Sequence, residues 1–202
     1  SDAHIVQAFH PVRIIIELNN ETTYDLINRE TPEKPVLPVS KKMVILSLDP
    51  FMPEGKAGQD AENLSKLVEK GYFNFVVNNL AHIHMLRSLR NPKIRMMAGP
   101  YLYTFNRWAV SFLENQNIMA LQTPHENSEE NLSATFETAE ERSRVLISVF
   151  SYPVLFRMRF ALPEDYDFTY FNDKEQMTFK VASDSDGAVV MPELPTSLLD
   201  KM

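Results

Sequence analysis

Apolar and polar residues alternate along the chain in blocks that predict strands followed by helices. Runs rich in β-branched and aromatic residues are typical of buried strands. Such runs occupy residues 12–18, 43–49, 71–79, 94–98, 118–121 and 144–151. Six strand–helix steps in succession predict a mainly parallel sheet with right-handed crossovers.

The segments between these runs carry apolar residues at helical spacing. Helices are predicted at residues 24–29, 61–70, 80–90, 107–115 and 128–141. In the fourth of these helices we expect Trp108, Phe112 and Leu113 to form the inward apolar face. Asn79 and Asn106 stand where a helix begins, and asparagine is a common N-cap.

The period changes after Pro153. Residues 168–171 and 177–181 predict a β-hairpin, residues 187–190 a further strand, and residues 194–201 a short helix or tether. The fold class expected is α/β: a partial or modified (β/α) TIM-like barrel with a C-terminal antiparallel β tail. We predict an entry segment at 1–11, a barrel-like domain at 12–160 and a tail at 161–202 packed on the same domain. A complete barrel usually takes about 250 residues, so 202 residues suggest an incomplete one.

Composition excludes several classes of function. The net charge of −7 and the pI near 5.3 argue against a general electrostatic grip on nucleic acid. The chain has no cysteine, which excludes disulfides, thiolate zinc sites and cysteine nucleophiles. No metal or cofactor is predicted. No apolar run reaches the length of a membrane span, and the expected compartment is the cytoplasm.

Polar and aromatic side chains follow the predicted strands, where α/β sheets place their sites. A Glu beside a His suits proton transfer, so Glu126 and His125 are the candidate catalytic pair. The candidate substrate-binding residues end or follow other strands: Glu17, Asp49, Asn79, Tyr101, Tyr103 and Asn106. We expect six of these side chains to converge at one end of the sheet: Glu17, Asp49, Asn79, Tyr101, Asn106 and Glu126.

Each candidate also has a structural interpretation. His125 and Glu126 can serve as loop residues before the next helix, and Asn78, Asn79 and Asn106 as hydrogen-bonding or capping residues. The aromatic residues after Gly99 can pack the mouth of the barrel instead of stacking on a ligand. His82 and His84 are two residues apart and face different sides of a helix, which argues against a metal pair.

Four sequence elements resemble the collagenase-like peptidase family, which is family 32 among the peptidases of unassigned mechanism. They are Val77-Asn78-Asn79-Leu80, Gly99-Pro100-Tyr101 with Asn106, Thr123-Pro124-His125-Glu126, and the strand at 149–155. In the tail, residues 172–179 are similar to the family's hairpin, and residues 195–200 are similar to its closing segment. The resemblance covers most of the chain from Val12 onward and is nearest to the C-terminal module of large members.

The chain departs from that family in ways that change the expected function. Members that modify RNA bases or quinones hold an iron–sulfur cluster with cysteines after the last barrel strand, where this chain has Phe156-Arg157-Met158-Arg159-Phe160. The family's Gly-Asp-Tyr is here Gly99-Pro100-Tyr101, which lacks a carboxylate. The resemblance therefore implies a non-catalytic module that binds a peptide, sugar or RNA element; the alternative is an active hydrolase that uses Glu126 and His125.

A partner is also expected. Six strand–helix steps leave a barrel open, and open strand edges tend to be covered or paired. The first strand, at residues 13–18, is apolar and β-branched and is the expected open edge. The partner predicted is either the rest of a longer polypeptide or another copy of the chain, with a peptide or RNA as ligand and no membrane.

Overall fold

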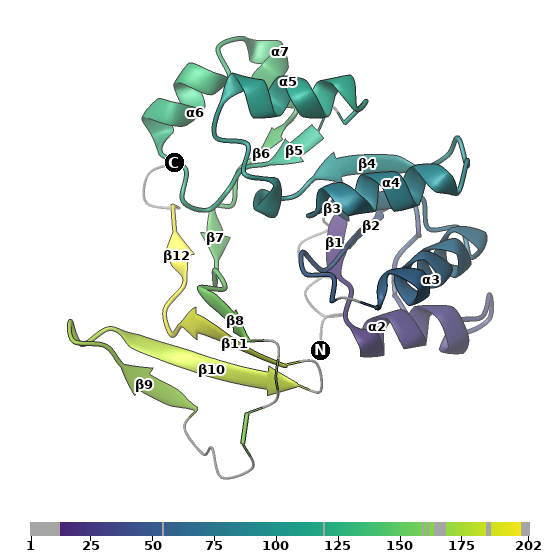
Figure 1. Ribbon diagram of the computed structural model, residues 1–202, viewed down its shortest axis with the longest axis horizontal. Helices are drawn as coiled ribbons and strands as arrows, with labels where there is room; N and C mark the ends of the chain where they lie inside the picture. Colours follow the sequence, from purple (N-terminus) through teal and green to yellow (C-terminus); the bar gives the residue numbers. More distant parts are fainter. Residues whose placement is uncertain are drawn as a thin grey trace. The chain divides into compact units, whose positions relative to one another are not determined.

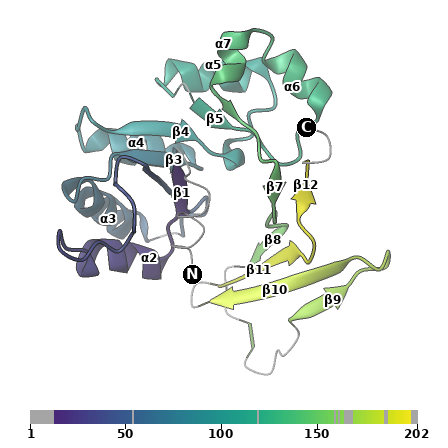
Figure 2. The ribbon, with the colours of Figure 1, turned by 180° about the vertical axis from the view of Figure 1, so that it is seen from behind.

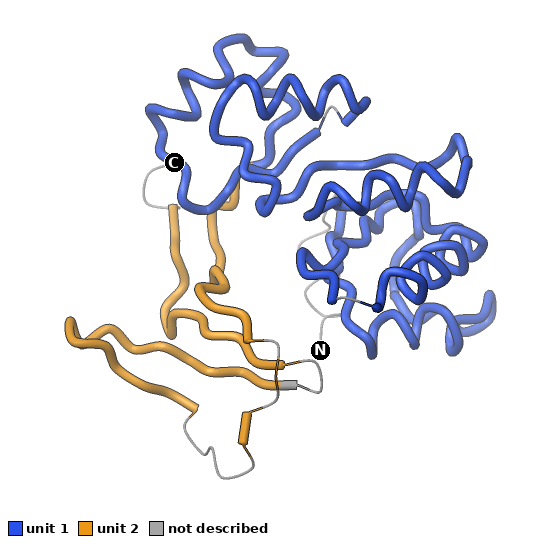
Figure 3. The backbone as a smooth tube through the Cα atoms, viewed as in Figure 1, with its two compact units in different colours: residues 1–146 blue, residues 147–202 orange. Residues whose placement is uncertain are grey.

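The chain folds into two compact units, residues 1–146 and 147–202, which Figure 3 draws in different colours. The structure is a computed structural model that describes residues 13–53, 55–118, 120–158, 160, 162–163, 169–184 and 187–198. The predicted entry segment at 1–11 lies outside the described residues.

The first unit is built on a six-stranded parallel sheet that curls into a half-barrel (Figure 1). Its strands follow one another in chain order: β1 (Ile14–Glu17), β2 (Val44–Ser47), β3 (Asn74–Val77), β4 (Arg95–Ala98), β5 (Ala120–Gln122) and β6 (Val145–Leu146). Every neighbouring pair is parallel, as in a (β/α) barrel. The predicted α/β class with a mainly parallel sheet is confirmed.

Helices connect these strands, and the view from behind in Figure 2 shows α3 and α4 as neighbours. The helical segments are α2 (Asn20–Tyr24), the π-helical turn η1 (Asp25–Arg29), α3 (Ala57–Glu69), α4 (Leu80–Ser88), the 3-10 turn η2 (Pro100–Leu102), α5 (Arg107–Asn115), α6 (Glu129–Thr135) and α7 (Ala139–Ser143). Side-chain oxygens cap five of them, from Asn19, Asn79, Asn106, Ser128 and Thr138.

The core of this unit lies between the sheet and its helices. The central strand β3 contributes Phe75 and Val77, both fully buried, and α3 contributes Leu64 and Leu67. Burying each such side chain stabilises the fold by about 1.5–3 kcal/mol relative to leaving it exposed. The near-continuous apolar strands of the sequence are therefore those of a sheet that helices cover.

A network of hydrogen bonds and one ion pair lies at the amino edge of the same sheet. Glu30 accepts a hydrogen bond from the Tyr72 hydroxyl (2.8 Å) and an ion pair from Lys41 Nζ (2.7 Å). Lys41 Nζ also donates to the carbonyl of Lys70 (2.8 Å), whose own Nζ donates to the carbonyl of Glu30 (2.9 Å). Burial and the Glu30 carboxylate together raise the pKa of Tyr72. This network joins the end of η1 to the residues that enter β2 and β3.

Two predicted elements are wrong because each is divided into two. The predicted helix at 128–141 is α6 and α7, since Thr138 and Glu141 form a capping box that starts a new helix. The predicted strand at 144–151 is β6 in the parallel sheet and β7 (Phe150–Ser151) in the second unit. An unbroken apolar pattern does not reveal where a strand passes from one sheet to another.

The predicted inward face of α5 is also wrong in part. Leu113 is buried, but Trp108 is 86% exposed and Phe112 is 48% exposed. Trp108 and Phe112 lie one turn apart, so both face away from the side that carries Leu113.

The second unit is an antiparallel sheet with a small core. Its strands pair in the order β8 (Phe156–Met158), β11 (Gly187–Pro192), β10 (Thr178–Asp184) and β9 (Tyr170–Asn172). The predicted antiparallel tail is confirmed, and Asp173 Oδ1 fixes the hairpin turn by accepting from the backbone N–H of Glu175 and of Met177 (2.8 and 2.9 Å). Only Val181, Ala188 and Val190 form its buried cluster among the described residues.

Of the short helix or tether predicted at residues 194–201, the described part is not helical. Residues 196–197 form strand β12 (Thr196–Ser197), which pairs with β7; the rest of the predicted segment from 199 on lies outside the described residues. No helix in the described part of the chain is long and apolar enough to cross a membrane.

Candidate functional site

The parallel sheet brings the predicted site residues to its carboxyl edge. Glu17 ends β1, and the other candidates lie in the loops after the strands: Asp49 after β2, Asn79 after β3, Tyr101, Tyr103 and Asn106 after β4, and His125 and Glu126 after β5. Parallel strands end at one edge of a sheet, so these loops share that edge.

A buried amide holds the carboxyl edge together beneath these loops. Asn78 Nδ2 donates to Ser47 Oγ (3.1 Å) and to the carbonyl of Leu48 (2.8 Å), which ties the end of β3 to the end of β2. Both acceptors are oxygens, which fixes the orientation of the amide. Asn78 Oδ1 has no hydrogen-bond partner among the described residues and lies against Gly99 at the end of β4.

The close approach of Asn78 explains why residue 99 is a glycine. A Cβ at this position would lie 1.8 Å from Asn78 Oδ1 and 2.7 Å from Cγ1 of Val76. No side chain fits there without moving a buried neighbour. Residues 78 and 99 therefore position the ends of three adjacent strands.

His82 is the second buried polar group at this edge. The backbone N–H of Asn78 donates to His82 Nδ1 (3.3 Å), so this nitrogen carries no proton. Burial lowers the pKa of His82 to about 4, and the nearby Asp49 carboxylate opposes that shift. His82 is therefore a neutral hydrogen-bond acceptor that fixes the start of α4.

Asn79 and Asn106 act as helix caps. Asn79 Oδ1 accepts from the backbone N–H of Ala81 (3.0 Å), and Asn106 Oδ1 accepts from that of Ala109 (3.0 Å). The structural interpretation of both residues thus has direct support. A role in ligand binding stays a prediction for each.

The loop between β4 and α5 carries a stacked aromatic pair, in which Tyr103 is exposed and Phe105 is half-buried. Tyr103 has a left-handed backbone (φ 50°, ψ 58°), which is uncommon for a residue with a side chain. Its ring stacks on Phe105 with centroids 6.0 Å apart and planes 15° apart, and Tyr103 is 55% exposed. Thr104 between them is fully buried, and its Oγ1 has no hydrogen-bond partner among the residues described.

His125 and Glu126 lie exposed in a turn between β5 and α6. Within the described residues, neither side chain forms a hydrogen bond or ion pair, with the other or with a third group. A general base is normally oriented by such a partner. Their catalytic role stays a prediction.

One amide joins this turn to the aromatic loop. Asn131 Nδ2, on α6, donates to the carbonyl of Phe105 (2.9 Å) and to Asn127 Oδ1 (2.7 Å). Because one NH₂ group reaches both acceptors, the Tyr103–Phe105 loop and the His125–Glu126 turn are neighbours. Sequence reasoning did not identify Asn131, whose spacing of four from Asn127 on a predicted helix is its one sequence signal.

Glu17 and Asp49 complete the edge as exposed carboxylates. Asp49 Oδ1 accepts from the backbone N–H of Phe51 (2.9 Å). Burial raises the pKa of Asp60, in the first turn of α3; Lys56 opposes the shift and Asp49 adds to it. In the described part of the chain, no three His, Asp or Glu side chains lie close enough to hold a metal ion.

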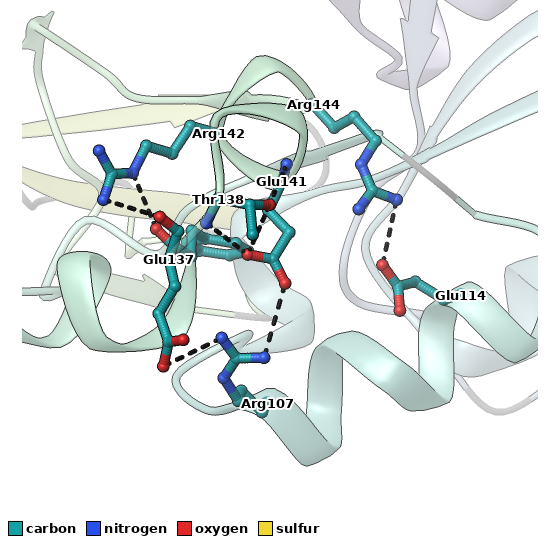
Figure 4. Close-up of polar contacts among 8 residues, drawn as sticks. Arg107, Glu114, Glu137, Thr138, Glu141, Arg142 and Arg144 are labelled. Atoms are coloured by element: carbon teal, nitrogen blue, oxygen red, sulfur yellow. Dashed lines mark hydrogen bonds and ion pairs between the residues drawn. The ribbon is translucent and has the colours of Figure 1, made fainter.

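A separate shallow groove of about 430 Å³ lies between helices α5, α6 and α7. Its charged residues Arg107, Glu114 and Glu141 are all ion-paired: Arg107 with Glu141 (3.5 Å) and with Glu137 outside the groove (3.2 Å), and Glu114 with Arg144 outside the groove (3.1 Å), as Figure 4 shows. Since Arg107 and Glu114 are occupied in this way, the groove presents mainly the exposed Trp108 to solvent. It contains none of the predicted site residues.

Comparison of the chain with protein-family models, with curated proteins and with solved structures found no match. The carboxyl edge is therefore interpreted on its own chemistry. It offers exposed aromatic rings and carboxylates over a rigid buried base, an arrangement suited to binding.

Proposed function

We propose that the chain is a peptide-binding module, related by resemblance to the collagenase-like peptidase family but without its cysteine cluster, and that it binds at the carboxyl edge. The observation that carries this proposal is the Asn131 amide, which unites an exposed aromatic loop and an exposed acidic turn. Three of the segments that resemble the family end or follow strands at the same edge: residues 77–80, 99–106 and 123–126.

Charge favours a peptide over RNA as the ligand. The described residues at this edge include the carboxylates Glu17, Asp49 and Glu126, and first helical turns add Glu21, Asp60, Glu129 and Glu130. The cations there are Lys56 and Arg107, and Arg107 already pairs with two glutamates. A surface of this kind repels phosphates and attracts a basic peptide.

The exposed state of Glu126 and His125 supports binding over hydrolysis. A catalytic Glu is usually held by a partner in a site that excludes water. Glu126 is solvated, and neither its carboxylate nor the His125 ring has an orienting group within the described residues.

We further propose that the half-barrel is an incomplete (β/α) barrel whose open edge is covered by a partner, either the rest of a longer polypeptide or a second copy. As far as the described residues extend, β1 pairs with β2 alone, and its side chains are three isoleucines and one glutamate. Such an edge is prone to strand pairing. A mass above 23.3 kDa by light scattering would support a second copy.

The test of peptide binding is to incubate the chain with a synthetic library of random peptides. Bound peptides are then eluted and sequenced by mass spectrometry. We expect intact, predominantly basic peptides. Cleaved peptides with the wild type but intact ones with Glu126→Gln would instead establish the hydrolase, and retention of no peptide above a blank support would overturn the proposal.

A further inference from the structure

The stacked pair of Tyr103 and Phe105 leaves an aromatic face open to solvent. The Tyr103 ring stacks, offset, on Phe105 with 6.0 Å between centroids, and Tyr103 remains 55% exposed. The electron-rich face of an aromatic ring attracts cations and planar groups.

Three other rings in the described part of the chain lie under one of the chain's own cations. The three pairs are Arg29 over Tyr24 (5.5 Å), Lys41 over Tyr72 (4.8 Å) and Lys93 over Phe73 (5.4 Å). In the described residues, no cation lies over Tyr103 or Phe105. The Tyr103 ring is therefore free to contact a cation of a ligand.

A carboxylate lies in the turn beside this ring pair. The Asn131 amide links the carbonyl of Phe105 to Asn127, and Glu126 is the residue before Asn127. Glu126 is exposed and has no ion-pair partner among the residues that the structure describes. The ring pair and this carboxylate therefore lie on two loops that the Asn131 amide holds side by side.

The backbone supports a binding role for the same loop. Tyr103 is held in a left-handed conformation that an L-residue adopts only at a cost. Such strain is found preferentially at ligand-binding positions, where the surrounding structure enforces it. Here the enforcing contacts include the fully buried Thr104 and the Asn131 bond to Phe105.

We infer that Tyr103, Phe105 and Glu126 form a subsite for an arginine side chain of the bound peptide, an inference that rests on the proposed peptide-binding function. A guanidinium group is planar, so it stacks on Tyr103, and its N–H fork suits the two oxygens of Glu126. A lysine ammonium has the charge without the plane, and it should bind more weakly here.

The experiment compares three short peptides that differ at one central position: arginine, lysine or citrulline, the neutral isostere of arginine. Each is titrated into ¹⁵N-labelled protein, and amide shifts are followed by NMR. We expect the arginine peptide to shift the amides of residues 103–106 and 125–127. It should bind about two- to fivefold more tightly than the citrulline peptide, the usual size of an exposed cation–π contact.

Matched variants separate the subsite from general charge effects. Tyr103→Phe keeps a ring and should keep the arginine preference, whereas Tyr103→Leu and Glu126→Gln should each reduce it. Tyr170→Leu and Glu193→Gln alter an exposed tyrosine and an exposed glutamate of the second unit, and should change nothing. Glu126→Gln carries the test alone if Tyr103→Leu fails to fold.

Two results would overturn the inference in distinguishable ways. Equal affinity for the arginine and citrulline peptides, with shifts still at the carboxyl edge, would remove the subsite but leave peptide binding intact. No shift with any of the three peptides, together with shifts on adding a neutral oligosaccharide or a short RNA, would remove the peptide-binding function itself.

Discussion

The two edges of the parallel sheet differ in how their polar groups are satisfied. At the amino edge, Glu30, Lys41, Lys70 and Tyr72 bond to one another, with Glu30 and Tyr72 almost fully buried. At the carboxyl edge, a buried amide from Asn78 lies under loops whose rings and carboxylates face solvent.

This difference indicates which residues of the fold contribute to stability and which are available for recognition. In α/β sheets the amino edge generally serves stability, whereas the loops at the carboxyl edge carry the site. Substitutions at the amino edge should therefore change the free energy of unfolding. Substitutions in the exposed loops of the carboxyl edge should change binding with little effect on stability.

The largest effect is expected at the amino edge, from Glu30→Ala. The change leaves the buried Tyr72 hydroxyl without an acceptor and Lys41 without its carboxylate. We expect a loss of about 3–4 kcal/mol in the free energy of unfolding, because a buried hydroxyl loses its acceptor, a partly buried ammonium loses its carboxylate and a cavity replaces the Glu30 side chain. Urea denaturation followed by far-UV circular dichroism measures it. Glu126→Ala is the control, and an equal loss there would contradict the comparison of the two edges.

The next effect is a dependence of stability on pH that His82 imposes. Its pKa is about 4 in the folded chain and about 6.5 when unfolded, so between these values the unfolded state binds more protons. The contribution of His82 to the free energy of unfolding should be fully present above pH 6.5. It should be lost as the pH drops towards 4, by about 3 kcal/mol in total. Unfolding of wild type and His82→Gln over this range gives the contribution as the difference in slope. Parallel slopes would contradict it.

The order of the strands and the Glu30 network differ in how well the sequence predicts them. The order and direction of the strands were predictable, because six apolar runs separated by helical patterns allow few other arrangements. The Glu30 network was not, because its members come from residues 30, 41, 70 and 72 and meet only once the helices have folded. Neither local periodicity nor composition indicates such a long-range contact.

The candidate site was predictable in position but not in detail. The ends of the strands identified the loops that hold Tyr103 and Glu126, because parallel strands share an edge. The sequence could not separate Asn78, which is buried and structural, from Asn79, which caps a helix. It also misplaced Trp108, since helical spacing locates an apolar stripe without saying whether that stripe is covered.

A smaller effect tests the buried base of the carboxyl edge. Gly99→Ala would put a methyl group 1.8 Å from Asn78 Oδ1, so the amide must leave Ser47 or the strand must shift. We expect a loss of about 1–3 kcal/mol, as for other overpacked positions. Gly58→Ala in α3 meets no atom within 4 Å and should instead stabilise the chain by about 0.5–1 kcal/mol. Urea denaturation of both variants measures these changes in the free energy of unfolding. If Gly99→Ala leaves that free energy unchanged, Asn78 is not a fixed part of the carboxyl edge.

The smallest effect concerns the strain at Tyr103. Replacing Tyr103 by Gly or by Leu removes the stacking on Phe105 in both cases, so the difference between the two variants isolates the cost of the left-handed backbone. Glycine adopts this conformation freely, whereas leucine does not, and we expect Tyr103→Gly to be more stable than Tyr103→Leu by about 1 kcal/mol. Tyr170, in strand β9, provides the matched position, where the order should reverse because glycine weakens a strand. If the leucine variant is more stable than the glycine variant at both positions, the backbone at Tyr103 is not strained. Strain then no longer supports a binding role for the carboxyl edge.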